Sequence, residues 1–334
     1  MSKQKSLMIS VASLAIAAAV TSIATVPARP GGAAAGAGRA PAGGAVTGKA
    51  APAAKAVGGG GAARASHASG AGIMASAGAQ QLCGYNIGPV RNGAYTVQNN
   101  EWGSSQKECV TTGGASGGAA FQVSTSAMSN PTKGPPGGYP SIYAGCHWGQ
   151  CTAGGLARTP LPVSDLTPGR VTSTLVTTTP PSGAYDVAYD IWVNQAPTTK
   201  TEPNGTEVMV WLNHAGGVQP AGSVVARNVL IGGHTYDVWY AKGTSAAGGT
   251  VTFNMTTPTA AVFNLDIGQL VQSASTHGWA NRTWYLIDVE AGFELWQGGA
   301  GLAVNDFSVA LGTRPFVGTP PVSIGPPGMP ARHS

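Results

Sequence analysis

The segment YLIDVEAGFELW, Tyr285–Trp296, alternates between apolar and acidic side chains. Successive side chains of a β-strand point to opposite faces of the sheet, so every second residue shares a face. One face is apolar throughout and should lie in the core; it holds Tyr285, Ile287, Val289, Ala291, Phe293 and Leu295. The other face combines carboxylates with a tryptophan; it holds Asp288, Glu290, Gly292, Glu294 and Trp296. The segment therefore predicts a strand with one buried face and one acidic face.

Two further segments alternate in the same way. In DVAYDIWVN, residues 186–194, the apolar set is Val187, Tyr189, Ile191 and Val193, and the opposite set is Asp186, Asp190, Trp192 and Asn194. In EVMVWL, residues 207–212, the apolar set is Val208, Val210 and Leu212, and the opposite set is Glu207, Met209 and Trp211. Solvated sheet faces mostly carry Lys, Thr and Ser. A face of Trp, Met, Asp and Glu without lysine therefore indicates a groove, and it suits a polysaccharide, whose apolar faces stack on aromatic rings and whose hydroxyls bind carboxylates and amides.

Strand signals dominate the middle of the chain, where short runs rich in Val, Thr, Tyr and Trp lie between Gly, Pro, Asn and Ser clusters. The clearest are GAYTVQNNEWG, AAFQVSTSAM, HTYDVWYA and GTVTFNMTT. Only FNLDIGQLVQSASTHG, residues 263–278, predicts a helix, because Ile267, Leu270 and Val271 form an apolar stripe at helical spacing. Many strands with one helix predict an all-β protein, a jelly-roll sandwich of two antiparallel sheets with one α-helix.

The two ends of the chain differ in composition from the middle. Residues 1–28 join a short basic segment to an apolar, Ala-rich run and a small-residue pattern, which is typical of a cleaved signal peptide. An uncleaved membrane anchor is the alternative. Residues 29–80 are mostly Ala, Gly, Ser and Pro and predict a disordered linker, and residues 315–334 predict a Pro-rich disordered tail. Residues 81–314 remain as one domain, which we expect to be extracellular.

The net positive charge of the chain comes from its first 80 residues. The first 80 residues hold seven of the 18 Lys and Arg and none of the 13 Asp and Glu. The remainder therefore carries 11 basic against 13 acidic residues, a formal charge of −2. Phosphate recognition needs a basic stripe, so we expect no nucleic-acid partner. We also expect a monomer that does not insert stably into a membrane once the leader is removed.

Four cysteines lie in the domain, and an exported protein favours disulfides. We favour Cys83 with Cys109 and Cys146 with Cys151, since only HWGQ separates the second pair. The alternative makes Cys146, His147 and Cys151 metal ligands, but a single Cys-x4-Cys is a weak zinc signal. We expect no metal, and no cofactor motif is present.

The chain contains six glutamates, which fall into two groups. Glu101, Glu108 and Glu202 lie in or beside polar turns and are expected on the surface. Glu207, Glu290 and Glu294 lie in the alternating segments. Glycoside hydrolysis needs two carboxyl groups beside the scissile bond, one to protonate the leaving oxygen and one to act as nucleophile or base. The alternative is that these carboxylates only form hydrogen bonds across the sheet or only bind sugar.

Four motifs together resemble glycoside hydrolase family 12, in its actinobacterial secreted branch, over residues 83–312. They are YDIWVN, EVMVWLNHAGGVQPAG, YPSIYAGCHWGQCT and AGFELWQGGAGLAVNDFSV. The resemblance implies a β-jelly roll whose concave face binds β-1,4-glucan and cuts it internally with retention of configuration. The expected enzyme is a secreted endo-β-1,4-glucanase, a cellulase acting on cellulose or mixed-linkage glucan.

The same resemblance implies roles for individual residues. Glu207 would be the nucleophile, Glu294 the acid/base, and Asp190 the residue that orients the nucleophile. Asn100 and Trp102 would hold sugar on the non-reducing side of the cut, while His147 and Met209 would line the same cleft. The cleft face defined by strand alternation adds two candidate substrate-binding residues, Trp192 and Trp296. The branch also implies the disulfide pairing favoured above.

Glu290 stands where the resemblance leads us to expect glutamine. A third carboxylate near Glu294 could raise the pKa of Glu294 by like-charge repulsion. The hypothesis is a pH optimum shifted upward relative to Glu290→Gln. Two other functions stay open at this point: a xyloglucan-specific endoglucanase, and a non-catalytic glucan-binding cell-wall protein.

Overall fold

The computed structural model describes five stretches of the chain, residues 78–113, 117–158, 160–198, 200–243 and 247–313. The predicted signal peptide, the linker up to residue 77 and the tail 315–334 lie outside the described residues. Within the described stretches, no helix is both long and apolar enough to cross a membrane.

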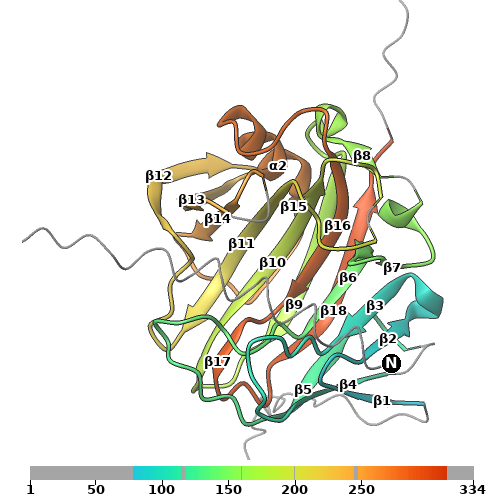
Figure 1. The fold of residues 1–334 in the computed structure, drawn as a ribbon, viewed down its shortest axis with the longest axis vertical. Coiled ribbons are helices and arrows are strands. Elements are labelled where there is room, and N and C mark those ends of the chain that lie inside the picture. Colours follow the sequence, from blue (N-terminus) through green and yellow to red (C-terminus); the bar gives the residue numbers. More distant parts are fainter. Residues whose placement is uncertain (1–77, 114–116, 159, 199, 244–246, 314–334) are drawn as a thin grey trace, which may run out of the picture. The chain divides into compact units, whose positions relative to one another are not determined.

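The described strands form two sheets (Figure 1). The first has six strands in the order β1 (Gln80–Cys83), β4 (Glu108–Thr112), β5 (Phe121–Ser126), β18 (Ala303–Leu311), β9 (Val171–Thr178) and β15 (Ala261–Asp266). The second has twelve strands; its main path is β12 (Ser223–Ile231), β13 (His234–Ala241), β14 (Thr250–Met255), β11 (Thr206–Ala215), β10 (Ala184–Asn194), β16 (Tyr285–Gly292), β6 (Ser141–His147), β3 (Tyr95–Gln98) and β2 (Ile87–Val90). Three short strands join it from the side: β7 (Gln150–Cys151), β8 (Leu161–Pro162) and β17 (Leu295–Gln297).

Helical structure is sparse in the described residues. It consists of the α-helix α2 (Ile267–Thr276) and the 3-10 turns η2 (Arg91–Gly93), η3 (Gly155–Ala157) and η4 (Val163–Asp165). The predicted all-β jelly roll of two sheets with one α-helix is confirmed.

One strand pair departs from the expected antiparallel arrangement, because β14 runs parallel to β11. The chain leaves β11 and enters the sheet at its edge as β12. From there β13 and β14 each pair antiparallel with the strand before, so β14 arrives beside β11 in the same direction. Among the strand pairs that the structure describes, β11 with β14 is the one pair for which the expectation of purely antiparallel sheets is wrong.

The core lies between the two sheets and uses the apolar faces that the alternation predicted. Val187, Tyr189, Ile191 and Val193 of β10 are all fully buried in it. Two aromatic pairs join the layers edge to face. Phe121 of the smaller sheet lies 6.0 Å from Phe293, and Tyr95 of the larger sheet lies 5.3 Å from Phe307. Each fully buried apolar side chain contributes about 1.5–3 kcal/mol, so this interface locks the larger sheet in register.

The alternation fails at the start of β16. The register with β10 passes from Trp192↔Asp288 directly to Val193↔Leu286, so Ile287 is an extra residue at a bulge. A bulge reverses which side chains share a face. Leu286 therefore belongs to the main core cluster, whereas Tyr285 is half-buried. Ile287 is 1% exposed and so buried as predicted, but it lies outside that cluster. The predicted core position of Tyr285 is wrong for this reason.

The helix begins four residues later than predicted. Residues 263–266 belong to β15, and Phe263 is 68% exposed. Asp266 caps the helix, since its Oδ1 accepts a hydrogen bond of 3.0 Å from Gln269 N. The apolar stripe of Ile267, Leu270 and Val271 is buried as expected.

Both predicted disulfides are present, Cys83–Cys109 and Cys146–Cys151. The first joins β1 to β4 and the second joins β6 to β7. Because both sulfur atoms of the second pair are bonded to each other, the alternative metal set of Cys146, His147 and Cys151 is wrong.

Glu108 is not a surface charge, which corrects the sequence expectation. It is fully buried on β4, and burial together with the charge of Glu101 raises the pKa of its carboxyl to about 8. The polar residues that precede Glu108 suggested a turn, but the residues that follow it form a strand. Glu101 and Glu202 are half-buried.

Gly145 marks the closest approach between β6 and β16. Its φ is +138°, and a Cβ built there would lie 2.2 Å from Ile287 O and 2.6 Å from Asp288 Cα. Both are backbone atoms, so neither can move aside without a shift of the strand. Only glycine therefore fits this position.

We predict that Gly145→Ala lowers the free energy of unfolding by about 2–4 kcal/mol, because backbone strain and overpacking add. Urea unfolding measures the change. Gly217→Ala is the matched control, since Gly217 also has positive φ (+74°) but nothing within 4 Å of the built Cβ. The control should lose about 1 kcal/mol. Equal losses in the two variants would show that the close approach costs nothing.

Candidate active site

Glu207 projects from β11, whose apolar residues fix it against the core. Val208, Val210 and Leu212 are buried in the main core, and Glu207 is half-buried on the opposite face. On the neighbouring strand β14, the hydroxyl of Thr250 donates a short hydrogen bond to Glu207 Oε2. Burial raises the pKa of Glu207 to about 7, the Thr250 bond lowers it, and the charge of Glu294 raises it further. Glu207 is therefore a carboxylate poised between its two protonation states near neutral pH.

Glu294 lies in a break between β16 and β17, not inside a continuous strand as predicted. The strand is interrupted after Gly292, and the flanking amides bond to another segment: Phe293 N donates to Pro140 O and Leu295 N donates to Gly138 O. Leu295 and Gln297 then resume pairing in β17, opposite Tyr185 and Ala184 of β10. The break holds Glu294 half-buried.

Asp186 on β10 holds the backbone of Glu294 in place. Glu294 N donates a 2.8 Å hydrogen bond to Asp186 Oδ1, and Asp186 N donates a 3.1 Å bond back to Glu294 O. Asp186 is fully buried, and burial followed by the charge of Glu294 raises its pKa well above the usual range. Burial also raises the pKa of Glu294, while its hydrogen bond with Asp186 lowers it. Asp186 therefore acts as a protonated partner that donates to the Glu294 carboxylate.

Asp190 occupies the centre of the acidic face. It lies opposite Met209 of β11 and Glu290 of β16, and it is 7% exposed. Burial raises its pKa well above the usual range, and the charges of Glu207 and Glu290 raise it further. Asp190 is thus kept protonated between two glutamates, a state in which it can donate a hydrogen bond.

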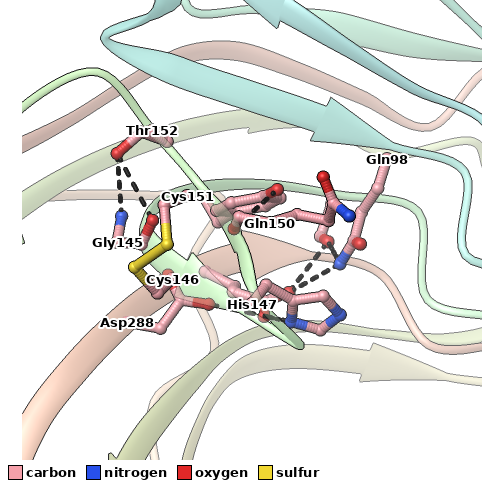
Figure 2. A network of polar contacts seen from close by, with 11 residues as sticks. Gln98, Gly145, Cys146, His147, Gln150, Cys151, Thr152 and Asp288 are labelled. Atoms are coloured by element: carbon pink, nitrogen blue, oxygen red, sulfur yellow. Dashed lines mark hydrogen bonds and ion pairs between the residues drawn. A yellow bond between two sulfur atoms is a disulfide. The ribbon is translucent and has the colours of Figure 1, made fainter. Parts of the chain in front are cut away.

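Glu290 is surrounded by donors. Its Oε2 accepts hydrogen bonds from Gln98 Nε2 at 2.9 Å and Ser141 Oγ at 3.1 Å, and its Oε1 contacts Nδ1 of His147. Figure 2 shows the His147 ring beside Gln98 and Asp288. Burial lowers the pKa of His147, but Glu290 and Asp288 outweigh it and raise that pKa to about 9. The imidazole is therefore held as a cation.

This arrangement bears on the hypothesis about Glu290. The pKa of Glu294 responds to burial and to Asp186, whereas Glu290 raises the pKa of Asp190 and, more weakly, that of Glu207. The repulsion that we assigned to the pair Glu290 and Glu294 falls instead on Asp190.

Several predicted substrate-binding residues lie together on the acidic face. Met209 and Trp296 belong to a second, smaller apolar cluster that also contains Ala184, Ala188, Trp211 and Val218. Trp296 donates from Nε1 to Gly134 O at 2.7 Å, which fixes its ring. On the other side of the face, Trp192 stacks edge to face with Trp148 at 5.0 Å, and Trp148 lies 4.2 Å from the His147 ring. Aromatic rings therefore flank the row of carboxylates.

Asn100 and Trp102 lie in the segment between β3 and β4, and both are half-buried. Asn100 has a positive φ of 46°, and its carbonyl accepts a 3.0 Å hydrogen bond from Tyr139 N. This bond ties the segment to the chain that enters β6. The sugar-holding role of Asn100 and Trp102 stays a prediction.

Five residues of the site were not anticipated as functional: Gln98, Ser141, Asp186, Thr250 and Asp288. Alternation had placed Asp186 and Asp288 on the acidic face, so their position was available from sequence. Their partners were not, because Glu294 and His147 reach them from other parts of the chain.

The chain was compared with known proteins. Residues 93–312 match the family model described as glycosyl hydrolase family 12. A "probable cellulase Cel12b" of Mycobacterium tuberculosis is 36% identical over 132 residues, which is 40% of this chain and 84% of that protein. "Endoglucanase S" of Pectobacterium parmentieri is 27% identical over 176 residues, 51% of this chain and 64% of that protein.

Solved structures agree with these matches. "Endoglucanase cel12A from Rhodothermus marinus" is 37% identical with a TM-score of 0.64, over 70% of this chain and 99% of that one. A family 12 xyloglucanase of Bacillus licheniformis is 26% identical with a TM-score of 0.59, over 70% of this chain and 99% of that one. The family model covers well over half of the chain. The chain therefore belongs to glycosyl hydrolase family 12.

Proposed function

We propose that this protein is a secreted retaining endo-β-1,4-glucanase that hydrolyses internal bonds of cellulose or mixed-linkage β-glucan. The observation that carries the proposal is the contrast between two glutamates on one sheet face. Glu207 accepts a hydrogen bond from Thr250, which favours its ionised form, whereas burial raises the pKa of Glu294 and favours its protonated form. A nucleophile and an acid need opposite protonation states, and these surroundings supply them.

In the first step, a carboxylate oxygen of Glu207 attacks the anomeric carbon and forms a glycosyl ester. Glu294 gives its proton to the glycosidic oxygen as that bond breaks. In the second step, Glu294 takes a proton from water, which attacks the same carbon and releases Glu207. Retention requires the two carboxyl groups to lie about 5–5.5 Å apart.

The other residues of the acidic face support this chemistry. Asp190, protonated between Glu207 and Glu290, can donate to the nucleophile and orient it. Trp192, Trp296 and Met209 pack beneath this face with only 4–7% of each residue exposed, and His147 offers a charged donor beside them. Asn100 and Trp102 complete the sugar-binding set on the non-reducing side.

Unbranched glucan is the preferred substrate class in this proposal. The Rhodothermus endoglucanase and the Mycobacterium probable cellulase are 37% and 36% identical to this chain, whereas the Bacillus xyloglucanase is 26% identical. Xyloglucan is the second candidate substrate. Secretion rests on the predicted leader and on two disulfides, which persist in oxidising compartments.

We predict that Glu207→Gln and Glu294→Gln each reduce reducing-sugar release by at least about 100-fold. The first removes the carboxylate that bonds to the sugar, and the second removes the group that transfers the proton. The assay uses soluble cellulose, mixed-linkage β-glucan and xyloglucan. Glu202→Gln is the matched control and should keep full activity. A folded wild type that binds these glucans without cutting them would favour the binding-protein alternative and overturn the assignment.

We predict that Thr250→Val moves the acidic limb of the kcat/KM profile upward by about one pH unit. The Thr250 hydroxyl favours ionised Glu207, so its removal raises the pKa of Glu207 above about 7, and the nucleophile is lost at a higher pH. Thr252→Val, two residues along the same strand, is the control and should leave the limb in place. An unchanged acidic limb in Thr250→Val would contradict the role of Glu207.

We predict that Asp186→Ala moves the basic limb upward and lowers kcat. The Asp186 hydrogen bond lowers the pKa of Glu294, so without it Glu294 keeps its proton to higher pH. Asp186→Asn retains both an acceptor for Glu294 N and a donor for the carboxylate. It should therefore restore the wild-type profile. A downward shift in Asp186→Ala, or failure of asparagine to rescue, would count against this role.

A further inference from the structure

His147, Asp288 and Glu290 form a compact cluster on the acidic face, and none of the three handles the bond or the proton in the proposed hydrolysis. Asp288 and Glu290 are two residues apart on β16, and β6 pairs with this strand through Asp288↔Gly145 and Glu290↔Tyr143. His147 lies two residues beyond Gly145, so all three side chains share one face. One ligand atom from each lies within 4.8 Å of the others. Two neighbouring strands thus bring one imidazole and two carboxylates close together.

Asp288 is the unusual member of the cluster. Its side chain is fully buried, and neither carboxylate oxygen has a hydrogen-bond partner. Its Oδ2 points toward Nδ1 of His147 at 3.7 Å, which is beyond hydrogen-bond distance (Figure 2). Buried carboxylates normally have partners, because an unpaired one is costly. Asp288 Oδ1 fits beside Gly145 because glycine has no Cβ; a Cβ built on Gly145 would lie 2.7 Å from Asp288 Oδ1.

Both carboxylates are fully buried, and the described salt bridges give them only His147 as a basic partner. A divalent cation would give both carboxylates a partner at the same time.

We propose that His147, Asp288 and Glu290 bind a divalent transition-metal ion of the Zn²⁺ class. Imidazole nitrogen with carboxylate oxygen is a ligand set that zinc accepts, and the nitrogen disfavours Mg²⁺ and Ca²⁺. Metal–ligand bonds of about 2.0–2.2 Å place ligand atoms roughly 3–4 Å apart, which small side-chain rotations would achieve here. The His147 side chain is 12% exposed, whereas the side chains of Asp288 and Glu290 are fully buried.

The ligands already have some of the support that metal sites need. Gln98 and Ser141 hold Oε2 of Glu290 and leave Oε1 on the His147 side. Such hydrogen bonds orient a ligand before the ion binds. The Cys146–Cys151 disulfide fixes the strand end beside His147.

Isothermal titration calorimetry with ZnCl₂ tests the proposal on the full chain after EDTA treatment and dialysis. Wild type should bind one Zn²⁺ that Asp288→Asn and Glu290→Gln each weaken at least about 10-fold. Asp306→Asn removes the same charge from an exposed position and should bind like wild type. Thermal unfolding without metal verifies that each variant is folded, and Co²⁺ absorption of wild type provides a second readout of nitrogen and oxygen ligands.

The proposal is overturned if wild type binds Zn²⁺ no tighter than about 1 mM, near −4 kcal/mol. It is equally overturned if both Asp288→Asn and Glu290→Gln, when folded, bind Zn²⁺ as wild type does. Should Asp288→Asn fail to fold, Glu290→Gln decides the matter, because a glutamine oxygen can still accept the bond from Gln98. Neither outcome depends on glucan hydrolysis.

Discussion

Strand β10 is buried along its whole length, and the rest of the structure depends on this constraint. One face of the strand holds Val187, Tyr189 and Ile191 in the core between the sheets. The other face must then carry Asp186, Asp190 and Trp192 on the acidic side of the sheet. Since apolar packing fixes the strand on one side, the carboxylates on the other side are positioned by the same energy that folds the protein.

Burial of so many acids makes protonation the central variable of the site. Asp186, Asp190 and Asp288 all have pKa values well above the usual range, first because they are buried and then because carboxylates surround them. At Glu207 the hydrogen bond from Thr250 lowers the pKa and so opposes the effect of burial. Glu290 accepts hydrogen bonds from Gln98 and Ser141 and contacts His147. The face therefore alternates between acids that hold a proton and acids that accept hydrogen bonds.

Alternation in the sequence predicted the core faces of β10 and β11 and the side on which the acids lie. It failed where the chain departs from a regular strand. The bulge at Ile287 shifted the core position to Leu286, and the break after Gly292 placed Glu294 outside a strand. A period of two cannot anticipate an inserted residue, because the insertion is selected by the neighbouring strand. Glu108 was misplaced for a similar reason, since its surroundings come from distant segments.

By itself, the sequence determined the fold class, the disulfide pairs and the acidic face to which Glu207 was assigned, because these follow from local pattern, short loops and recognisable motifs. Tertiary structure decided the partners of each acid. Thr250 reaches Glu207 across a parallel strand pair, Asp186 holds Glu294 over a separation of 108 residues, and His147 meets Asp288 through strand pairing. Protonation depends on burial and on these contacts, and both exist only once the sheets have closed on each other.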